Sequence, residues 1–245
     1  PKVFRDLRDL WGLINSYSER KRILARASFS AILLSVCRET RHWGYVCDNT
    51  RPLDNHEADV LDAYCSKLEA FRQAYKERDR DFKNRFGAEA DLPASSVICD
   101  TAEHALSECE SNSVELVVTS PPYFGVHDYV KAQRLSHEWF QQRIDPLRRS
   151  EIGARSKRRR KNARGEYLEE LAKVFEELSR VLCQDGTLCT VVGQSESRTS
   201  VLSDLRTRLS SNGLYIDLDL NRSISSQRRQ NPSLQEEHLI VATPA

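Results

Sequence analysis

The chain has 245 residues, of which 39% are apolar and 30% are charged, so it is long and apolar enough to bury a core and is not a disordered polymer. Its 37 basic and 36 acidic side chains leave a net charge of +1, so net charge alone neither indicates nor excludes nucleic acid as a partner. No stretch approaches the apolar length of a membrane span or a signal peptide, so we expect a soluble cytoplasmic protein without a membrane partner.

Seven cysteines are scattered along the chain without a Cys-x-x-Cys pair or a Cys/His cluster at zinc spacing, so no metal site is expected and the thiols are interpreted as reduced packing residues. Methionine is absent, and the chain opens on Pro1. That start fits a product whose initiator methionine was removed, and it equally fits a fragment of a longer protein.

Residues 1–92 are predicted to form a helical region. Apolar residues recur at helical spacing over 7–17 and 23–34, which predicts a helical pair, and again from Ala58 to Phe86, which predicts one long amphipathic helix. Between these helices, residues 41–52 carry Gly, Asn, Pro and two large aromatic residues. Those rings either fix a loop to the protein body, the commoner case, or stack on a ligand.

Residues 93–245 are predicted to form an α/β part. Helical patterns over 167–182 and 201–209 alternate with short apolar runs, and a turn is predicted at 184–186. Alternation of this kind predicts a mainly parallel sheet that is covered by helices on both faces. The predicted strands are 97–99, 114–118, 187–192, 214–220 and 238–243.

The strand over Val114–Val118 stops at Thr119-Ser120-Pro121-Pro122-Tyr123, because two consecutive prolines cannot continue a strand or a helix. This sequence places a hydroxyl, rigid backbone carbonyls and an aromatic ring at the carboxyl end of a strand, where open α/β sheets bind ligands. The simpler interpretation is a Pro-Pro turn without a function.

Thr119–Tyr123 resembles the catalytic motif of the amino-methyltransferases, the DNA methylases of restriction-modification systems that act on an exocyclic base nitrogen. The serine form of the motif is most typical of enzymes that make N4-methylcytosine, although some adenine enzymes carry it. Other segments resemble one branch of the same family and extend the similarity over most of the chain: Cys47–Pro52, Asp128–Leu135, Trp139, Glu151–Gly153, Arg180–Leu182, Asp185-Gly186 and Glu236–His238.

The resemblance implies a Rossmann-like class I methyltransferase sheet, of which this chain holds the third to seventh strands, with a helical N-terminal insertion. It also implies roles for the motif. The Ser120 hydroxyl and the Pro121 carbonyl accept the two amine hydrogens, Pro121 and Pro122 keep these acceptors rigid, and Tyr123 stacks on a base flipped out of the duplex.

The cofactor implied by the resemblance is S-adenosylmethionine. Asp100 matches the family position that contacts the adenine of this cofactor, although an ordinary acidic cap is an equally simple role for it. Thr101, Thr119 and Ser120 would lie at the same site, and Asp128 beside it is either part of the site or a loop-stabilising residue.

The glycine-rich cofactor loop of the family and the acidic residue that holds the ribose are not found. The chain has nine glycines and no Gly-x-Gly. In the family the first two strands lie between the third and the fourth, so their absence would leave a gap of about 14 Å with unpaired edges. We therefore expect either a fragment or a naturally split enzyme in which a second polypeptide supplies the missing part.

A dense basic segment follows the motif and is the predicted site of contact with DNA phosphates, although such a run also fits a solvated loop. The predicted DNA-binding face is extended by three arginines of a later loop, Arg222, Arg228 and Arg229. The basic segment comprises Arg148, Arg149, Arg155, Lys157, Arg158, Arg159, Arg160, Lys161 and Arg164.

Three other functions remain open from the sequence. The chain could be a non-catalytic DNA-binding or regulatory subunit with a methyltransferase shape, an N6-adenine methylase, or a methylase of RNA or of a protein glutamine, where related motifs carry Asn more often than Ser.

Overall fold

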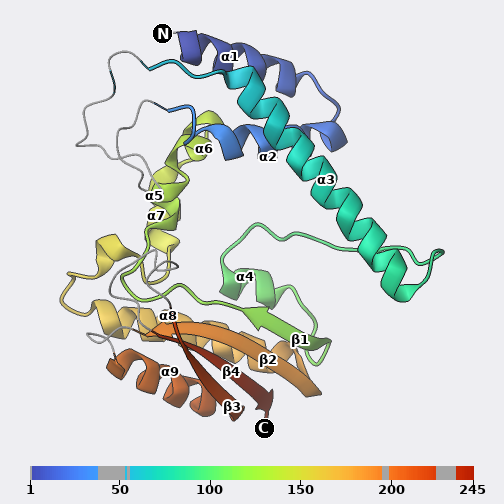
Figure 1. Ribbon diagram of the computed structural model, residues 1–245. Helices are drawn as coiled ribbons and strands as arrows, with labels where there is room; N and C mark the ends of the chain where they lie inside the picture. The colour runs from blue at the N-terminus through green and yellow to red at the C-terminus, as the bar shows by residue number, and fades with distance from the viewer. Residues whose placement is uncertain (1, 38–52, 54–55, 195–198, 225–235) are drawn as a thin grey trace. The chain divides into compact units, whose positions relative to one another are not determined.

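The computed structural model describes residues 2–37, 53, 56–194, 199–224 and 236–245 (Figure 1). These residues form two compact units, Pro1–Ser96 with Val130–Arg148, and Val97–Tyr129 with Arg149–Ala245. The helical region was predicted to end at residue 92 and the α/β part to be continuous. The structure instead places residues 130–148 in the helical unit.

The helical unit is built on α1 (Lys2–Asn15), α2 (Glu19–Ile32) and α3 (Val60–Phe86), so all three predicted helices are confirmed. Its core is formed by buried apolar side chains from one face of α1, one face of α2 and the first turns of α3. The later segment adds α5 (Tyr129–Ala132), α6 (Arg134–Trp139) and α7 (Ile144–Ser150). Trp139 packs edge-on against Phe29 at 5.2 Å between ring centroids, which explains why this segment belongs to the helical unit.

Most of the apolar stripe of α3 is exposed. Asp59 caps the helix by accepting a hydrogen bond from the Asp62 amide at 2.9 Å, but of its 27 residues only Val60 and Tyr64 are buried. Tyr75 and Phe86, which belong to the predicted apolar stripe, are largely exposed. Tertiary packing therefore accounts for the start of this helix and not for its length.

The sheet of the second unit has the order β1-β2-β4-β3. β1 (Val114–Thr119) and β2 (Leu182–Gln194) are parallel, whereas β4 (Glu236–Pro244) is antiparallel to both β2 and β3 (Leu214–Ser223). The α/β class is confirmed, but the prediction of a mainly parallel sheet is wrong for the described strands. In the described sheet β1 pairs with β2 alone, so its outer edge is unpaired.

The predicted strand at 97–99 is not present. This segment has no regular structure, and Val97 is 95% exposed. A strand requires a neighbour to satisfy its backbone groups, and within the described residues no strand pairs with this segment.

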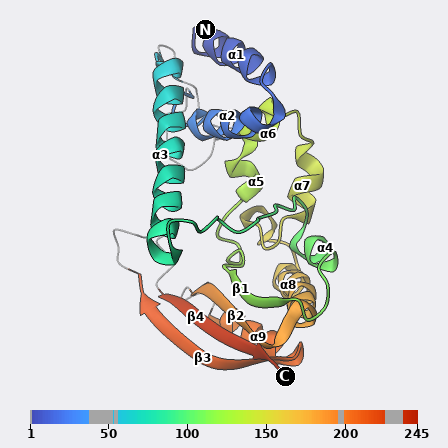
Figure 2. The same cartoon turned by 90° about the vertical axis from the view of Figure 1, so that its right-hand side faces the viewer.

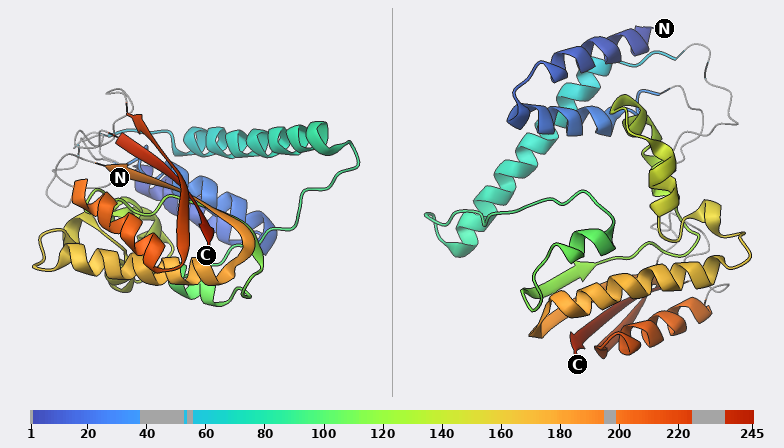
Figure 3. Two further views of the ribbon diagram at one scale, coloured as in Figure 1. Left: turned by 90° about the horizontal axis from the view of Figure 1, so that it is seen from below. Right: turned by 180° about the vertical axis from the view of Figure 1, so that it is seen from behind.

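One face of the sheet is covered by α8 (Ala163–Val181) and α9 (Thr199–Ser211), which are visible on the same side of the strands in Figures 2 and 3. Phe175 of α8 and Leu205 of α9 pack there against Leu188 and Ile240. The prediction that both faces are covered is wrong for the described residues, because the opposite face exposes large apolar side chains: Leu116, Val118, Tyr215, Leu218, Leu220 and Leu239.

The turn predicted at residues 184–186 lies inside β2 as a bulge. Val114 pairs with Leu182 and Leu116 pairs with Thr187, so four residues of β2 lie opposite one residue of β1. A Cβ atom at Gly186 would lie only 2.8 Å from the Cys183 carbonyl oxygen, which explains why a glycine stands here.

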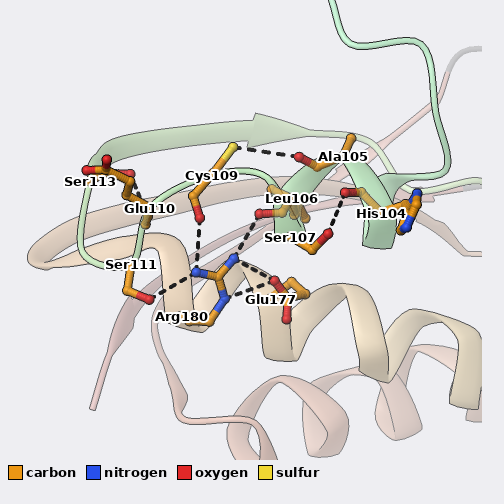
Figure 4. A network of polar contacts seen from close by, with 10 residues as sticks. All are labelled: His104, Ala105, Leu106, Ser107, Cys109, Glu110, Ser111, Ser113, Glu177 and Arg180. Carbon is orange, nitrogen blue, oxygen red and sulfur yellow. Dashed lines mark hydrogen bonds and ion pairs between the residues drawn. The ribbon is translucent and has the colours of Figure 1, made fainter.

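Arg180 joins the last turn of α8 to the segment that enters β1 (Figure 4). Its guanidinium donates hydrogen bonds to the carbonyls of Leu106, in α4 (Ala102–Ser107), and Cys109 at 2.8 and 3.0 Å, and to the Ser111 hydroxyl at 2.9 Å. It also pairs with Glu177 at 2.7 Å. The planar fork of donors thus holds the connection between α4 and β1 against α8.

Replacing Arg180 with alanine is expected to destabilise this connection by about 1.5–3 kcal/mol, because carbonyls that are partly buried lose a charged donor. The measurement is amide hydrogen exchange of peptides covering residues 106–119 in the full chain. Arg208→Ala, which removes an exposed arginine from α9, is the matched control and should leave these amides unchanged. Equal exchange in both variants would contradict the anchoring role.

Two sequence predictions concern residues outside the described part of the chain: the aromatic segment 41–52, and Arg228 with Arg229. Of the cysteines that are described, Cys65 and Cys99 are exposed, so a packing role is wrong for them. Among the described residues, no helix is long and apolar enough to cross a membrane, and no cluster of His, Cys, Asp and Glu could hold a metal ion.

Candidate active site

The predicted motif follows β1 directly, at the end of the sheet where the carboxyl ends of β1 and β2 meet. Thr119 is the last residue of β1 and pairs with Thr190 of the parallel strand β2. Residues 119–129, here called the motif loop, continue from this point. The structure therefore confirms the predicted strand and its end.

Ser120 is anchored to the neighbouring strand. Its hydroxyl donates a hydrogen bond to the carbonyl of Val191 in β2 at 3.1 Å, while the side chain remains exposed. A hydroxyl has one hydrogen and two acceptor lone pairs. Because Val191 takes the hydrogen, Ser120 can offer a ligand only its acceptor lone pairs.

The two prolines differ in their surroundings. The Pro122 carbonyl accepts a hydrogen bond of 3.0 Å from the hydroxyl of Tyr167, a residue of α8 that is only 2% exposed. Burial raises the pKa of Tyr167, so its hydroxyl stays protonated and remains a donor. Pro121 is buried, and its carbonyl accepts no hydrogen bond from the part of the chain that the structure describes.

Tyr123 is half-buried, and its hydroxyl donates to the Glu237 carboxylate of β4 at 3.2 Å. Arg222 of β3 pairs with the other oxygen of Glu237 at 2.7 Å. Burial raises the pKa of Tyr123, which keeps the phenol neutral. The ring is therefore held from two strands on the far side of β2.

Sequence reasoning missed Tyr167 and Glu237 as residues that support the site. Tyr167 belongs to the apolar stripe of α8, and a buried tyrosine usually requires a partner for its hydroxyl; that requirement was the available signal. Glu237 was noted only as part of a resemblance, and nothing in its spacing indicates that it reaches Tyr123.

Beside Glu237, His238 and Asp219 form a second polar group on the same two strands. His238 Nδ1 lies 2.8 Å from an Asp219 oxygen, and Arg206 donates to the other at 2.8 Å. Although burial opposes ionisation of Asp219, the hydrogen bonds from His238 and Arg206 lower its pKa below the ordinary 3.8.

This lowered pKa predicts a dependence of stability on pH. A carboxylate whose pKa is depressed by folding stabilises the folded state above its unfolded pKa, and the contribution is lost as pH falls through the folded pKa. We expect Asp219→Asn to be less stable than the parent at neutral pH, and the difference to shrink below pH 3.8. Urea unfolding at a series of pH values measures it; a constant difference would contradict the assignment.

The last residues of the motif loop contact residues 149–157, here called the support loop. Asp128 accepts a hydrogen bond from the Ser156 amide at 2.8 Å, so its loop-stabilising role has direct geometric support. The carboxylate of Glu151 accepts one from the Tyr129 amide. Burial, followed by the nearby Arg155, lowers the pKa of His127.

Asp100 and Thr101 stand at the start of α4, and their hydrogen bonds are made there. Thr101 caps the helix through the His104 amide, and Asp100 accepts from the Thr101 amide at 2.7 Å and lies 2.9 Å from His104 Nδ1. Both side chains that were predicted to face a cofactor therefore serve the cap of α4, and the Asp100 carboxylate keeps further acceptor lone pairs.

The basic segment divides into engaged and exposed cations. Lys157 is buried, Arg164 pairs with Asp204, and Arg160 lies 3.8 Å from Glu166. The interpretation of the whole segment as one phosphate-binding surface therefore requires revision, because Lys157 cannot reach a duplex without leaving its partners. Outside these contacts, the exposed cations of the segment are Arg148, Arg149, Arg155, Arg158, Arg159 and Lys161.

Comparison with protein-family models finds no match. Among curated proteins, the chain is 28% identical over 107 residues to the type II methyltransferase M.SmaI of Serratia marcescens. The aligned residues make up 44% of this chain and 29% of that protein. It is 32% identical over 89 residues to the type II methyltransferase M.MjaII of Methanocaldococcus jannaschii, 36% of this chain and 16% of that protein.

Among solved structures, PvuII DNA methyltransferase, which is cytosine-N4-specific, is 11% identical and aligns over 62% of this chain and 50% of its own, with a TM-score of 0.40. The two sequence matches confirm the predicted resemblance to methyltransferases. In both, the aligned part is less than a third of the relative's length.

Proposed function

We propose that this chain carries the amine-binding half of an S-adenosylmethionine-dependent DNA amino-methyltransferase whose target is an exocyclic base nitrogen, N4 of cytosine in the first instance. The observation that carries the proposal is Ser120 at the end of β1. Its hydrogen is given to Val191, so it faces a ligand as an acceptor, and the neighbouring Pro121 carbonyl has no described partner.

These two acceptors suit the chemistry of an exocyclic amine. The nitrogen lone pair is delocalised into the base ring, which makes the amine a poor nucleophile. Acceptors at Ser120 and Pro121 would each hold one amine hydrogen and draw the nitrogen towards tetrahedral geometry, so that the lone pair is directed away from the ring. No strong general base is needed, because the proton becomes acidic only after transfer.

The remaining motif residues would position the base. Pro122 is held by Tyr167, and Tyr123 is held by Glu237, so the backbone and the ring beside the amine are fixed before a base arrives. A flipped base stacked on Tyr123 would present its amine to the acceptors.

S-adenosylmethionine would supply the methyl group, but the described residues fit only part of a site for it. Thr119 and Ser120 lie at the strand end, whereas Asp100 and Thr101 are occupied at the cap of α4 and are exposed. The chain also has no Gly-x-Gly. We therefore propose that a second polypeptide or a further segment completes the cofactor site.

Two features of the sheet support completion by more polypeptide. The outer edge of β1 is unpaired in the described residues, and an unpaired edge is a template for another strand. The adjoining face exposes Leu116 and Val118, the latter by 75%. Apolar side chains exposed together in this way mark a surface that another element covers.

Contact with DNA would come from the exposed cations of the basic segment. Arg155, Arg158, Arg159 and Lys161 follow the motif loop in the same unit and would bind phosphates, which supplies affinity without a sequence code.

Nucleoside mass spectrometry tests the reaction. DNA is incubated with S-adenosylmethionine and with this chain, alone or together with candidate completing polypeptides from the same source, and is then digested. N4-methylcytosine is expected only in the completed preparation, and N6-methyladenine would shift the target to the adenine alternative. Light scattering and a cofactor titration run in parallel, and a monomer that binds the cofactor tightly alone would refute the need for completion.

The second candidate is a DNA-binding or regulatory subunit that does not catalyse. The hydrogen bonds of Asp100 to the Thr101 amide and to His104 favour it, since they give Asp100 the role of an ordinary acidic cap. In that case the completed preparation would bind DNA and yield no methylated nucleoside.

A further inference from the structure

Lys157 stands in the most basic stretch of the chain but does not behave as a surface cation. It is only 9% exposed, and its ammonium donates hydrogen bonds to the carbonyls of Arg149 and Glu151 at 2.7 and 2.5 Å. The carboxyl group of Glu170 on α8 is also close to Lys157: burial raises the pKa of Glu170, and the charge of Lys157 opposes that rise. A charge is buried at this level only when it is compensated, and these groups provide the compensation.

The carbonyls that Lys157 holds belong to the support loop, which in turn holds the motif loop. The Gly125 amide donates to the Gly153 carbonyl at 2.8 Å, and the Arg155 amide donates to the His127 carbonyl at 2.9 Å. The contacts of Asp128 with Ser156 and of Glu151 with Tyr129 add two more. Four hydrogen bonds therefore join the two loops. Lys157, the last residue of the support loop, binds two carbonyls near the beginning of the same loop.

Packing reinforces this link. Gly153 has φ +62°, and a Cβ atom there would lie 2.7 Å from the ring of Tyr167. The same ring lies 5.2 Å from Phe124 of the motif loop, and its hydroxyl holds Pro122. The support loop at Gly153 and the motif loop at Phe124 and Pro122 thus contact the same side chain, Tyr167.

We infer that Lys157 is a positioning residue that fixes the motif loop through the support loop, and that it is not a phosphate contact. This inference rests on the proposed function for its consequence in methyl transfer. The link between Lys157 and the motif loop does not depend on the proposed function, because all of its hydrogen bonds lie within one unit of the chain.

The test compares Lys157→Met, which keeps the length and removes the charge, with Arg158→Gln, which neutralises the exposed neighbouring cation. The first measurement is amide hydrogen exchange of peptides covering residues 123–131 and 151–157 in the full chain. Lys157→Met should accelerate exchange at Gly125, Tyr129 and Arg155 by about tenfold or more. Arg158→Gln should leave these rates unchanged.

The second measurement is DNA affinity as a function of salt, with a random-sequence duplex as the probe. Arg158→Gln should reduce the slope of log K against log salt by about 0.9, and Lys157→Met should leave the slope unchanged. The opposite pair of results, a reduced slope and unchanged exchange for Lys157→Met, would overturn the inference in favour of a phosphate contact.

Unfolding of the unit by Lys157→Met would appear as lost protection from amide exchange in α8 and β2. In that case a second variant, Glu151→Ala, provides the test. This variant removes the acceptor of the Tyr129 amide and leaves the ammonium in place. Faster exchange confined to the motif loop supports the inference, and no change overturns it.

In the completed enzyme Lys157→Met should lower kcat more than it raises KM, with Lys157→Arg recovering part of the loss. If exchange responds as expected but no preparation transfers methyl groups, the loop link stands and the proposed function fails.

Discussion

Replacing Ser120 with alanine is expected to lower methyl transfer by about 100-fold in the completed enzyme, the scale of loss when one preorganised polar group at a reacting centre is removed. The reason is specific to this site. Ser120 gives its hydrogen to Val191 and keeps acceptor lone pairs for the amine, so alanine removes one of the two acceptors without opening the core. The measurement is incorporation of labelled methyl groups into DNA.

Ser107→Ala is the matched control, because it removes an exposed hydroxyl that bonds only within α4. It should retain full activity. Tyr123→Phe separates the two parts of the tyrosine: it keeps the ring and loses the bond to Glu237, so it should lose less activity than Tyr123→Ala. Full activity of Ser120→Ala would exclude the proposed role and favour the non-catalytic alternative.

Neutralising the exposed cations Arg158, Arg159 and Lys161 together with glutamine is expected to weaken DNA binding by about 100-fold at 0.15 M salt. Each phosphate contact releases counterions when it forms, so three lost contacts should reduce the salt slope by about 2.7. Fluorescence anisotropy with a labelled duplex over a range of salt concentrations gives both quantities.

The control for this triple variant changes the same charge elsewhere. Lys76, Arg78 and Arg80 are exposed on α3, in a stretch that also carries acidic side chains. Changing these three to glutamine should leave the slope nearly unaltered. Equal effects from the two triple variants would mean that binding follows overall charge and that the basic segment is not a distinct interface.

The elements that sequence alone predicted correctly are those with a sustained period. α8 and α9 carry apolar residues at helical spacing that all face one sheet, and β1 ends where two prolines stop it. The chemistry of Ser120 and Tyr123 was also accessible, because it depends on residue type and on position after a strand.

Strand direction and loop contacts were not accessible. An alternating pattern is the same whether a strand runs parallel or antiparallel, so the antiparallel β3–β4 pair could not be distinguished. The run at 97–99 had a strand's composition, but pairing decides whether a strand forms. Lys157 belongs to a run of cations, and only the backbone around it shows that its charge is used internally.

Because residues 130–148 belong to the helical unit, truncating the chain at one point does not yield either unit alone. The chain passes between the units after residues 96, 129 and 148, so no single cut separates them. A product beginning at residue 97 would carry Leu135 and Trp139 without the helical core against which they pack. Independent production of the sheet unit therefore requires excising residues 130–148 and bridging Tyr129 to Arg149 with a short linker.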